Sequence, residues 1–419
     1  DFFNTLSALN VISSKLPIGV ETIYKPGKKL FIRMKKIIYI TLSYLLISFN
    51  TYVNSNEKND NHLKIGVLAP FSGEFKDFGE TVLHAVNLAL NDIGDESIKI
   101  YPKDSGSDKK KIIKACKEFQ SEGVKIIIGP TDSKFLNELS NFEDLIFLSL
   151  SNIDSNFKNN IIMLGVNLES QLIAMKKFIQ KNKRKKTVIL YPNNDYAKYV
   201  EKNIKSVNFN NKKLFKYSTD PKSLTNQIEK LTNYKQRKIN LETRIKKLEE
   251  SEFSQDSREL QKLKQKHTLG KVNFDSIIII DFGIGLKSVL TSLAYTDVLE
   301  KDVLIIAANQ WFDDSILNET SISNFYFPSV DLKNFNRFKK KFYDTFDYKP
   351  NDVTILSYDS VGLIYYLWKK NVKINSVKDF NMKNDIKGKI GKFRISENKV
   401  IQKLNIYQLD QNTFVKSNL

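Results

Sequence analysis

Residues 63–73 have the sequence LKIGVLAPFSG, an apolar run that ends in a proline, a serine and a glycine. A short apolar run closed by such turn-forming residues is typical of a buried strand. Residues 78–92 follow with apolar side chains at helical spacing, and this pattern predicts an amphipathic helix. A buried strand followed directly by a helix is the repeating unit of a parallel sheet that helices cover on both faces. These residues therefore predict an α/β fold.

The same alternation continues along the chain in two series. The first series is expected to have strands at 63–68, 98–101, 124–128 and 145–150, with helices at 78–92, 109–122 and about 134–140. The second series is expected to have strands at 161–166, 187–191, 213–217, 276–280 and 303–307, with helices at 168–180, 194–207, 286–295 and 332–346. A helix at 352–368 and a terminal hairpin within 389–414 complete the pattern.

Two series of this kind predict an α/β protein with two lobes, each a parallel sheet flanked by helices. We expect lobe one over residues 56–165 together with part of 350–419, and lobe two over residues 166–349. The chain would then cross between the lobes more than once. Its length of 419 residues also exceeds what one ordinary core contains.

Residues 222–270 form a segment far longer than a crossover between neighbouring strands needs. Apolar residues recur at spacings of three, four and seven, as in a coiled coil, at Leu224, Ile228, Leu231, Tyr234, Leu241, Ile245 and Leu248. Residues 251–257 interrupt the pattern, and a shorter arm begins near Leu260. We predict a projecting helical hairpin insertion whose first arm extends about 40 Å. Such a hairpin could be a solvated strut or a partner-binding arm, and the pattern leaves both open.

Residues 34–55 have the layout of a signal peptide, in which the basic pair Lys35-Lys36 precedes an apolar run and polar residues follow it. We expect cleavage near Ser55. No cysteine follows the apolar run, so no lipobox is expected, and the mature protein should be periplasmic and meet a membrane only through a partner. Residues 1–33 end directly before Met34 and are interpreted as an upstream segment translated in error.

The composition narrows the range of functions. The chain has 66 lysine and arginine residues against 47 aspartate and glutamate residues, for a formal net charge of +19. Acids are interspersed among these bases and no nucleic-acid-binding motif accompanies them, so we expect no nucleic-acid partner. A single cysteine, Cys116, excludes an internal disulfide framework, and three scattered histidines offer no zinc constellation. We therefore expect neither a metal nor a cofactor.

The sequence also lacks the patterns of a catalytic centre. It contains no G-x-S-x-G nucleophile elbow. Residues 283–288, with the sequence GIGLKS, have two glycines of a phosphate-binding turn, but the third is replaced by Ser288. A dinucleotide site is therefore not expected. We expect the protein not to be an enzyme.

Several stretches resemble type I periplasmic binding proteins of the leucine-binding group. They are residues 63–73 with Gly79 and the helix at 85–90, IIIGP at 126–130, and YDSV at 358–361. The resemblance spans residues 63–415. Within that family the sequence looks most like the penicillin-binding protein activator subgroup, on the residues TLG at 268–270, FDSI at 274–277, DFG at 281–283 and NQWFDD at 309–314. It implies a two-lobed type I fold in which a cleft closes on a ligand.

The resemblance also suggests which residues bind that ligand. In leucine-binding relatives, loops after the strands of the first lobe hold the amino-acid head group, and the matching positions here are Ser72, Thr131, Ser133, Ser149 and Ser151. Across the cleft the corresponding loop ends carry Tyr191, Asp195, Tyr196, Asp281 and Trp311. Hydroxyls and backbone N–H groups of this kind could bind a carboxylate. Each of these residues could equally be a helix cap or a packed aromatic side chain.

Two functions follow from the resemblance. The first is an activator-like regulator of peptidoglycan synthesis, whose partner would be a peptidoglycan synthase. The alternative is the substrate-binding component of an ABC transporter for an amino acid or related solute, whose partner would be an ABC permease. A transporter component needs a saturable small ligand, whereas a regulator can act without one. A fold of this kind does not by itself decide between them.

Overall fold

The structure is a computed structural model, and it describes residues 62–152, 160–250, 254–298, 301–308, 312, 325–370, 372–410 and 413–417. The expected leader, its cleavage site and the upstream segment lie outside these ranges. His62–Leu419 forms one compact unit, which is the unit described below. No helix among the described residues is both long enough and apolar enough to cross a membrane.

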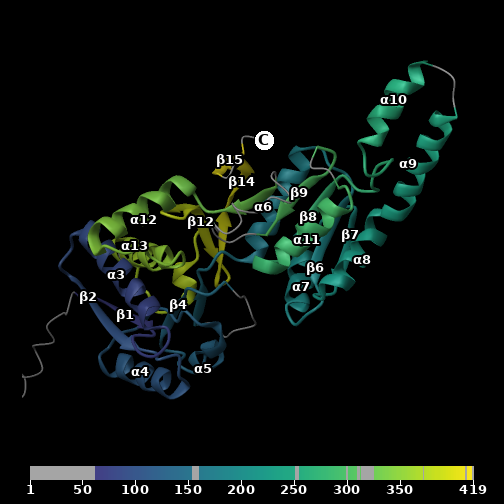
Figure 1. Cartoon of the computed structure of the whole chain (residues 1–419). Helices are drawn as coiled ribbons and strands as arrows, with labels where there is room; N and C mark the ends of the chain where they lie inside the picture. Colours follow the sequence, from purple (N-terminus) through teal and green to yellow (C-terminus); the bar gives the residue numbers. More distant parts are fainter. Residues whose placement is uncertain are drawn as a thin grey trace, which may run out of the picture. The chain divides into compact units, whose positions relative to one another are not determined.

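The first sheet has eight strands in the order β11-β12-β13-β5-β4-β3-β1-β2 (Figure 1). Their bounds are β1 (Leu63–Ala69), β2 (Ile98–Asp104), β3 (Ile126–Ile128), β4 (Ile146–Ser149), β5 (Ile161–Met163), β11 (Ile386–Gly388), β12 (Gly391–Ser396) and β13 (Lys399–Lys403). Strands β1 to β5 pair in parallel, while β11, β12 and β13 pair antiparallel with one another. The predicted strand-and-helix alternation over the first series is confirmed.

Helices cover both faces of this sheet. Alternate residues of β1 point to opposite faces, and they pack against different helices. Ile65 and Val67 pack in one cluster with α3 (Lys76–Ile93) and α13 (Thr354–Lys369). Leu68 packs in another cluster with α4 (Lys109–Ser121) and α5 (Leu136–Leu139). This arrangement confirms the predicted α/β class with helices on both faces of a mostly parallel sheet.

The second sheet has seven strands in the order β15-β14-β10-β9-β8-β6-β7. Their bounds are β6 (Thr187–Pro192), β7 (Lys212–Tyr217), β8 (Ser276–Ile279), β9 (Leu304–Ala307), β10 (Tyr326–Ser329), β14 (Asn405–Asp410) and β15 (Thr413–Lys416). Strands β6 to β10 pair in parallel. One face packs against α6 (Leu168–Lys181) and α7 (Ala197–Val207), and the other against α8 (Pro221–Thr232) and α11 (Gly283–Tyr295).

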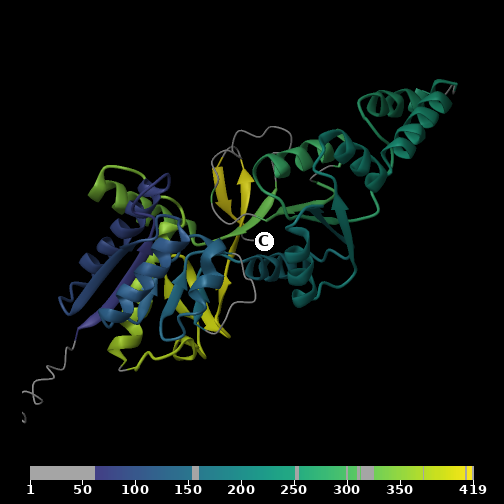
Figure 2. The ribbon, with the colours of Figure 1, turned by 90° about the horizontal axis from the view of Figure 1, so that it is seen from below.

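The end of the chain differs from the predicted single hairpin. It forms five strands, β11 to β15, and only Leu404 separates β13 in the first sheet from β14 in the second. Figure 2 shows the yellow strands of both sheets. Strand β10 was also not predicted. It is four residues long and contains Pro328, which weakens the strand signal in the sequence.

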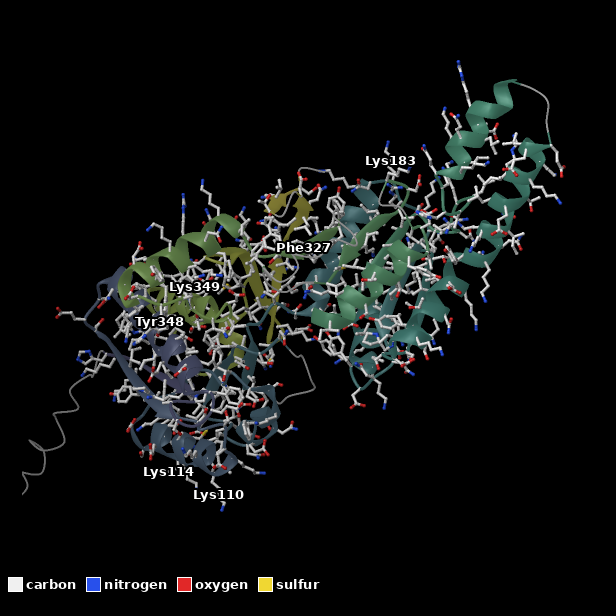
Figure 3. The ribbon with its side chains drawn as sticks, in the orientation of Figure 1. Lys110, Lys114, Lys183, Phe327, Tyr348 and Lys349 are labelled. Carbon is white, nitrogen blue, oxygen red and sulfur yellow. The ribbon has the colours of Figure 1, made fainter. Side chains whose placement is uncertain are left out.

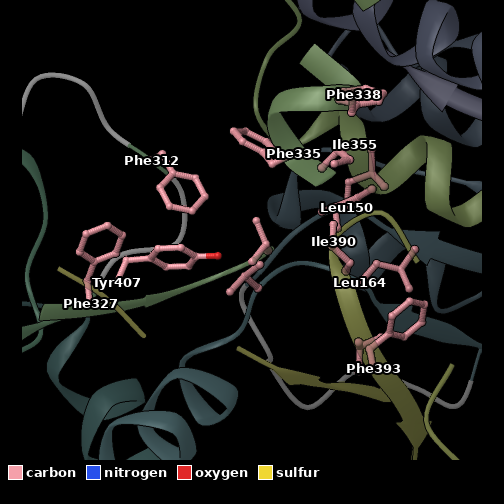
Figure 4. Close-up of a cluster of buried hydrophobic side chains, with 14 of the residues drawn as sticks. Leu150, Leu164, Phe312, Phe327, Phe335, Phe338, Ile355, Ile390, Phe393 and Tyr407 are labelled. Atoms are coloured by element: carbon pink, nitrogen blue, oxygen red, sulfur yellow. The ribbon is translucent and has the colours of Figure 1, made fainter. Parts of the chain in front are cut away.

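Aromatic side chains fill the core around β10 and β14. The rings of Phe312 and Tyr407 lie 5.0 Å apart, and those of Phe312 and Phe327 lie 5.9 Å apart (Figure 4). The Tyr407 hydroxyl accepts a hydrogen bond from the backbone N–H of Leu332 at 2.8 Å, where α12 (Leu332–Phe346) begins. Helix α12, which the pattern places in the second series, packs against α3, with His84 stacked on Phe346 at 4.3 Å.

The insertion is helical, but its first arm is not continuous. Asn233 has a left-handed backbone with φ of 51° and separates α8 from α9 (Tyr234–Glu249). Leu224 and Ile228 of α8 belong to the main core, whereas α9 and α10 (Ser254–Lys264) share a small core of their own. Figures 1 and 2 show α9 and α10 side by side as a hairpin. The prediction of one long arm is therefore wrong at Asn233, and α9 alone spans about 24 Å.

Candidate ligand-binding site

A cavity of about 360 Å³ lies where the parallel strands of the first sheet end. We call it the strand-end cavity, and it is lined by Pro70, Phe75, Phe78, Ser107, Thr131, Asp132, Ser133, Leu150, Ser151, Asn152, Gly165, Val166, Val353 and Leu356. These residues come from the loops after β1 to β5 and from the starts of α3 and α13. Parallel strands bring all their carboxyl ends to one edge, which is where α/β sheets bind ligands.

Three of the five hydroxyl residues expected in this region line the cavity. They are Thr131 and Ser133 after β3 and Ser151 after β4. Ser149 does not line it, because its side chain is fully buried beneath these loops. Its hydroxyl donates to the Pro130 carbonyl at 3.2 Å and accepts from the Ser151 N–H at 3.3 Å. Ser149 therefore positions the two loops that carry the other hydroxyls.

Ser72 is also held away from the cavity by its own neighbours. Its hydroxyl donates to Oδ2 of Asp104 at 2.6 Å and accepts from Nζ of Lys111 at 2.6 Å. Oδ1 of Asp104 accepts from the backbone N–H groups of Phe71 and Gly106, both at 2.8 Å. Asp104 is thus the anchor of the loop after β1. The sequence alone did not identify it, since it lies 32 residues from the serine it binds.

The pKa of Asp104 reflects these bonds. Burial raises the pKa, but hydrogen bonds from Ser72, Lys111 and the backbone outweigh burial and lower it from 3.8 to about 2. A carboxyl whose pKa is lower in the folded state stabilises the fold when it is ionised. That stabilisation is present above the unfolded pKa and is lost as the pH falls through the folded value.

We expect Asp104→Asn to lower the free energy of unfolding by about 1–2 kcal/mol at pH 7, because two backbone donors and one lysine lose a charged partner. The difference from the unchanged protein should shrink between pH 4 and about pH 2, where Asp104 itself becomes protonated. Urea unfolding at several pH values measures this effect. Asp344→Asn, which removes a carboxylate 53% exposed on α12, is the control and should change stability little. A difference that stays constant with pH would contradict the assignment.

The described residues expected from the second lobe lie at the strand ends of the second sheet, and none of them lines the strand-end cavity: they are Tyr191, Asp195, Tyr196 and Asp281. Tyr191 is buried, and its hydroxyl donates to Oε1 of Glu201 at 3.0 Å. Burial and Glu201 raise the pKa of Tyr191 to about 12. Asp281 accepts hydrogen bonds from the Tyr217 hydroxyl and, at 2.8 Å, from the Phe282 N–H. Both side chains therefore have partners within the protein.

Tyr196 belongs to an aromatic group at the same edge. Its ring lies 5.3 Å from that of Tyr199 and 6.3 Å from that of Phe282. Burial raises the pKa of Tyr196, so its hydroxyl stays neutral and can donate a hydrogen bond. The Tyr199 hydroxyl donates to the carbonyl of Asn152, which lines the strand-end cavity, at 3.4 Å. Trp311 lies outside the described residues.

Exposed apolar side chains at the strand ends were missed by the sequence reasoning. Phe75, at the rim of the strand-end cavity, is 50% exposed. Ile284, at the start of α11, is 84% exposed. Both follow a strand within a loop or a first helical turn, so the available signal was an apolar residue placed where turn residues are usual. Of the two, Phe75 lines the strand-end cavity and so adds apolar surface to it.

Comparisons with known proteins agree with this fold. Residues 62–231 match a family model described as a periplasmic binding protein. A search of curated protein sequences found no match.

Several solved structures have a similar fold. The LpoA (YraM) C-domain from Haemophilus influenzae, described as a regulator of PBP1A, has a TM-score of 0.58 at 14% identity and covers 84% of this chain and 99% of that one. Full-length LpoA from the same organism has a TM-score of 0.58 at 14% identity over 86% of this chain, which spans 60% of that protein. An ABC transporter substrate-binding protein from Desulfitobacterium hafniense, in complex with Leu, has a TM-score of 0.54 at 15% identity over 85% of this chain and 100% of that one.

At these identities the likeness to solved structures is a likeness of fold. Of the structures named above, one is described as a regulator of PBP1A and another is in complex with Leu. The two mostly parallel sheets, each covered by helices, have the type I periplasmic binding protein fold, and within the chain residues 62–231 match the periplasmic binding protein family.

Proposed function

We propose that this protein is a non-enzymatic regulator of peptidoglycan synthesis that acts on a peptidoglycan synthase, as penicillin-binding protein activators do. The observation that supports this proposal most is the likeness to the LpoA C-domain, which extends over 99% of that domain. That domain is described as a regulator of PBP1A. A fold match at this identity supports a hypothesis about the role of the protein, but it does not identify the residues that would contact a partner.

The chemistry of the strand-end cavity favours a regulator over an amino-acid carrier. A free amino acid brings a carboxylate and an ammonium group, and a tight site must pair both. Among the described lining residues, Asp132 is the one carboxylate, and no lysine, arginine or histidine lines this cavity. Asp132 is already engaged, since it accepts from the Lys134 N–H at 3.0 Å and pairs with the Lys134 ammonium at 3.0 Å. The cavity therefore holds no uncommitted anion for an ammonium group.

Solute binding for an ABC transporter is the second candidate, and one observation favours it. Thr131, Ser133 and Ser151 together line a cavity of about 360 Å³ that also has apolar walls from Phe78 and Leu356. Small-molecule sites are usually apolar pockets with a few polar groups of this kind. A small solute held mainly by hydroxyl groups and apolar contact would fit this lining.

One experiment with two arms separates these functions. In the first arm, the purified protein is added to a bifunctional peptidoglycan synthase from the same cell, and the rate of glycan and crosslink formation is measured. We expect the rate to rise and the increase to saturate with the protein. In the second arm, the melting temperature of the protein is measured with a panel of amino acids, short peptides and muropeptides.

The second arm has a defined scale. A ligand at one hundred times its dissociation constant adds about 2.7 kcal/mol to stability, which is readily seen as a melting shift. A saturable shift with an amino acid that Thr131→Val abolishes and Thr131→Ser retains, together with no effect on the synthase, would overturn the regulator proposal. It would make solute binding the function. A rate increase without any shift from an amino acid supports the regulator.

A further inference from the structure

A second and larger cavity belongs to the second sheet. It lies at the edge where the parallel strands of that sheet begin, whereas the strand-end cavity lies where the strands of the first sheet end. The volume of this second cavity is about 860 Å³, and we call it the hairpin-base cavity. Three parts of the chain line it, together with Arg237 of α9: Arg184 and Lys186 before β6, residues 265–275 before β8, and residues 297–298 and 301–303 before β9. Strands β6, β8 and β9 are direct neighbours in the sheet, which brings these segments together. Figure 3 labels Lys183 in the turn that leads into the first segment.

The lining of this cavity is predominantly basic. The cationic side chains are Arg184, Lys186, Arg237, Lys266, Lys271 and Lys301, and the anionic ones are Asp275, Asp297 and Asp302. Cationic side chains that surround one cavity add their charges, and together they create a positive electrostatic potential inside it. The surplus of cations predicts an anionic ligand.

Two of the three acids are occupied by bonds within the protein. Asp275 accepts from the backbone N–H groups of Lys185 at 2.8 Å and Lys186 at 3.0 Å. Asp297 accepts from the Thr268 hydroxyl at 2.5 Å and lies 3.8 Å from the Arg237 guanidinium. These acids hold the walls of the cavity in place. Six cationic side chains against three carboxylates leave this lining with a formal charge of +3.

Several cationic donors remain for a ligand. Nε of Arg184 is buried and has no hydrogen-bond partner, while its Nη1 donates to the Asp302 carbonyl at a long 3.4 Å. No ion pair joins Lys266 or Lys271 to another described residue. An anion in the cavity would give Lys266 and Lys271 the charged partner that the described residues do not supply.

The site is also held open before any ligand arrives. Arg237 uses its own donors on the protein, to the carbonyls of Gly270 at 3.1 Å, Thr296 at 3.0 Å and Asp297 at 2.9 Å, and to the Thr268 hydroxyl at 2.7 Å. It thereby fixes the loop that carries Lys266 and Lys271 against the turn after α11. A site whose walls are fixed in advance binds its ligand at lower entropic cost.

We infer that the hairpin-base cavity binds a phosphate-bearing anion. Phosphate groups suit several lysines together with an arginine, because their oxygens accept from more than one cation at once. The chemistry is shared by a soluble diphosphate and by a phosphorylated envelope polymer. The lining also has two rings, Phe274, which is 7% exposed, and His267, which is exposed. This site goes beyond the proposed regulation of a synthase and does not depend on it.

The test uses the full mature chain, inorganic pyrophosphate and a long-chain polyphosphate, with binding measured by titration calorimetry. Lys266→Gln combined with Lys271→Gln removes two cations from the cavity. Lys198→Gln combined with Lys205→Gln on α7 removes the same net charge from a surface outside it. We expect the first double variant to bind at least about tenfold more weakly, and the second to match the unchanged protein.

The outcomes divide clearly. Binding of pyrophosphate that depends on Lys266 and Lys271 supports a compact diphosphate site, and the same dependence with polyphosphate alone supports a polymer site. Equal losses in both double variants would mean that the overall charge of the protein attracts any polyanion, and this result would overturn the proposal. No measurable binding of either probe at low ionic strength, where charge attraction is strongest, would overturn it as well. Circular dichroism of each variant verifies that the fold is kept.

Discussion

Gly79→Ala is expected to lower the free energy of unfolding by about 2–3 kcal/mol, although alanine favours helices more than glycine does. Gly79 lies in the first turns of α3, where the helix passes directly beneath the loop after β1. A Cβ atom at this position would lie 2.1 Å from the carbonyl oxygen of Pro70 and 2.6 Å from its carbonyl carbon. Both are backbone atoms, so neither can turn aside as a flexible side chain could. Overpacking of this kind costs more than the roughly 1 kcal/mol gained in helix propensity.

The same substitution should change the strand-end cavity. Pro70 lines that cavity, and the loop that follows it is anchored to Asp104 through Phe71 and Ser72. Displacing Pro70 therefore strains these hydrogen bonds. We expect amide exchange in the loop after β1 to become faster in Gly79→Ala, in addition to the lower unfolding midpoint in urea.

Gly362→Ala is the matched control because it has the opposite expected sign. Gly362 lies on the exposed face of α13, and nothing lies within 4 Å of a Cβ atom built there. Alanine should stabilise that helix by about 0.5–1 kcal/mol. If both substitutions stabilise the protein, the close approach of α3 to Pro70 does not exist in solution.

Much of the fold followed from the sequence pattern because its signals are local. The helix expected at 332–346 has those bounds in α12, since Asp331 caps its start and Asp347 adopts a left-handed backbone at its end. The strand expected at 276–280 is β8, which ends one residue earlier. The ends of a helix or strand depend on the residues next to it, and these residues can be identified directly in the sequence.

The features that escaped prediction depend on distant residues. The break at Asn233 interrupts a continuous apolar spacing, and it divides α8, which packs on the main core, from α9, which packs with α10. The division of β11 to β15 between two sheets depends on pairings far apart in the chain, of β13 with β5 at Lys399 and Met163 and of β14 with β10 at Gln408 and Tyr326. The β-propensity of a residue depends on its local sequence and does not predict which distant strand it pairs with.

The candidate site divides in the same way. Parallel strand order brings Thr131, Ser133 and Ser151 to one cavity, and a pattern of strands is enough to expect that. The hydroxyl of Ser72 is taken by Asp104 and Lys111, which lie elsewhere in the sequence. Which polar groups remain for a ligand is therefore a property of the folded chain and not of the motif.

Arg237→Ala is expected to destabilise the base of the helical hairpin by about 3 kcal/mol. The side chain is 6% exposed, and its guanidinium donates to three backbone carbonyls and one hydroxyl. Removing it leaves those acceptors and Asp297 without their charged donor in a buried place, which costs several times what an exposed pair contributes. The Leu269 N–H donates to the Arg237 carbonyl at 3.0 Å and reports on this base directly. Its amide exchange should become about one hundredfold faster.

Arg244→Ala provides the comparison on the same helix. Arg244 is 45% exposed and donates to Oε1 of Glu259 on α10 at 2.8 Å and 3.1 Å. An exposed pair of this kind contributes at most about 1 kcal/mol. The two substitutions remove the same side chain from one helix, so a difference between them isolates the buried network of Arg237. Equal effects on Leu269 exchange would show that α9 is held by the small apolar core that it shares with α10, and that the buried guanidinium adds nothing to the attachment of the hairpin.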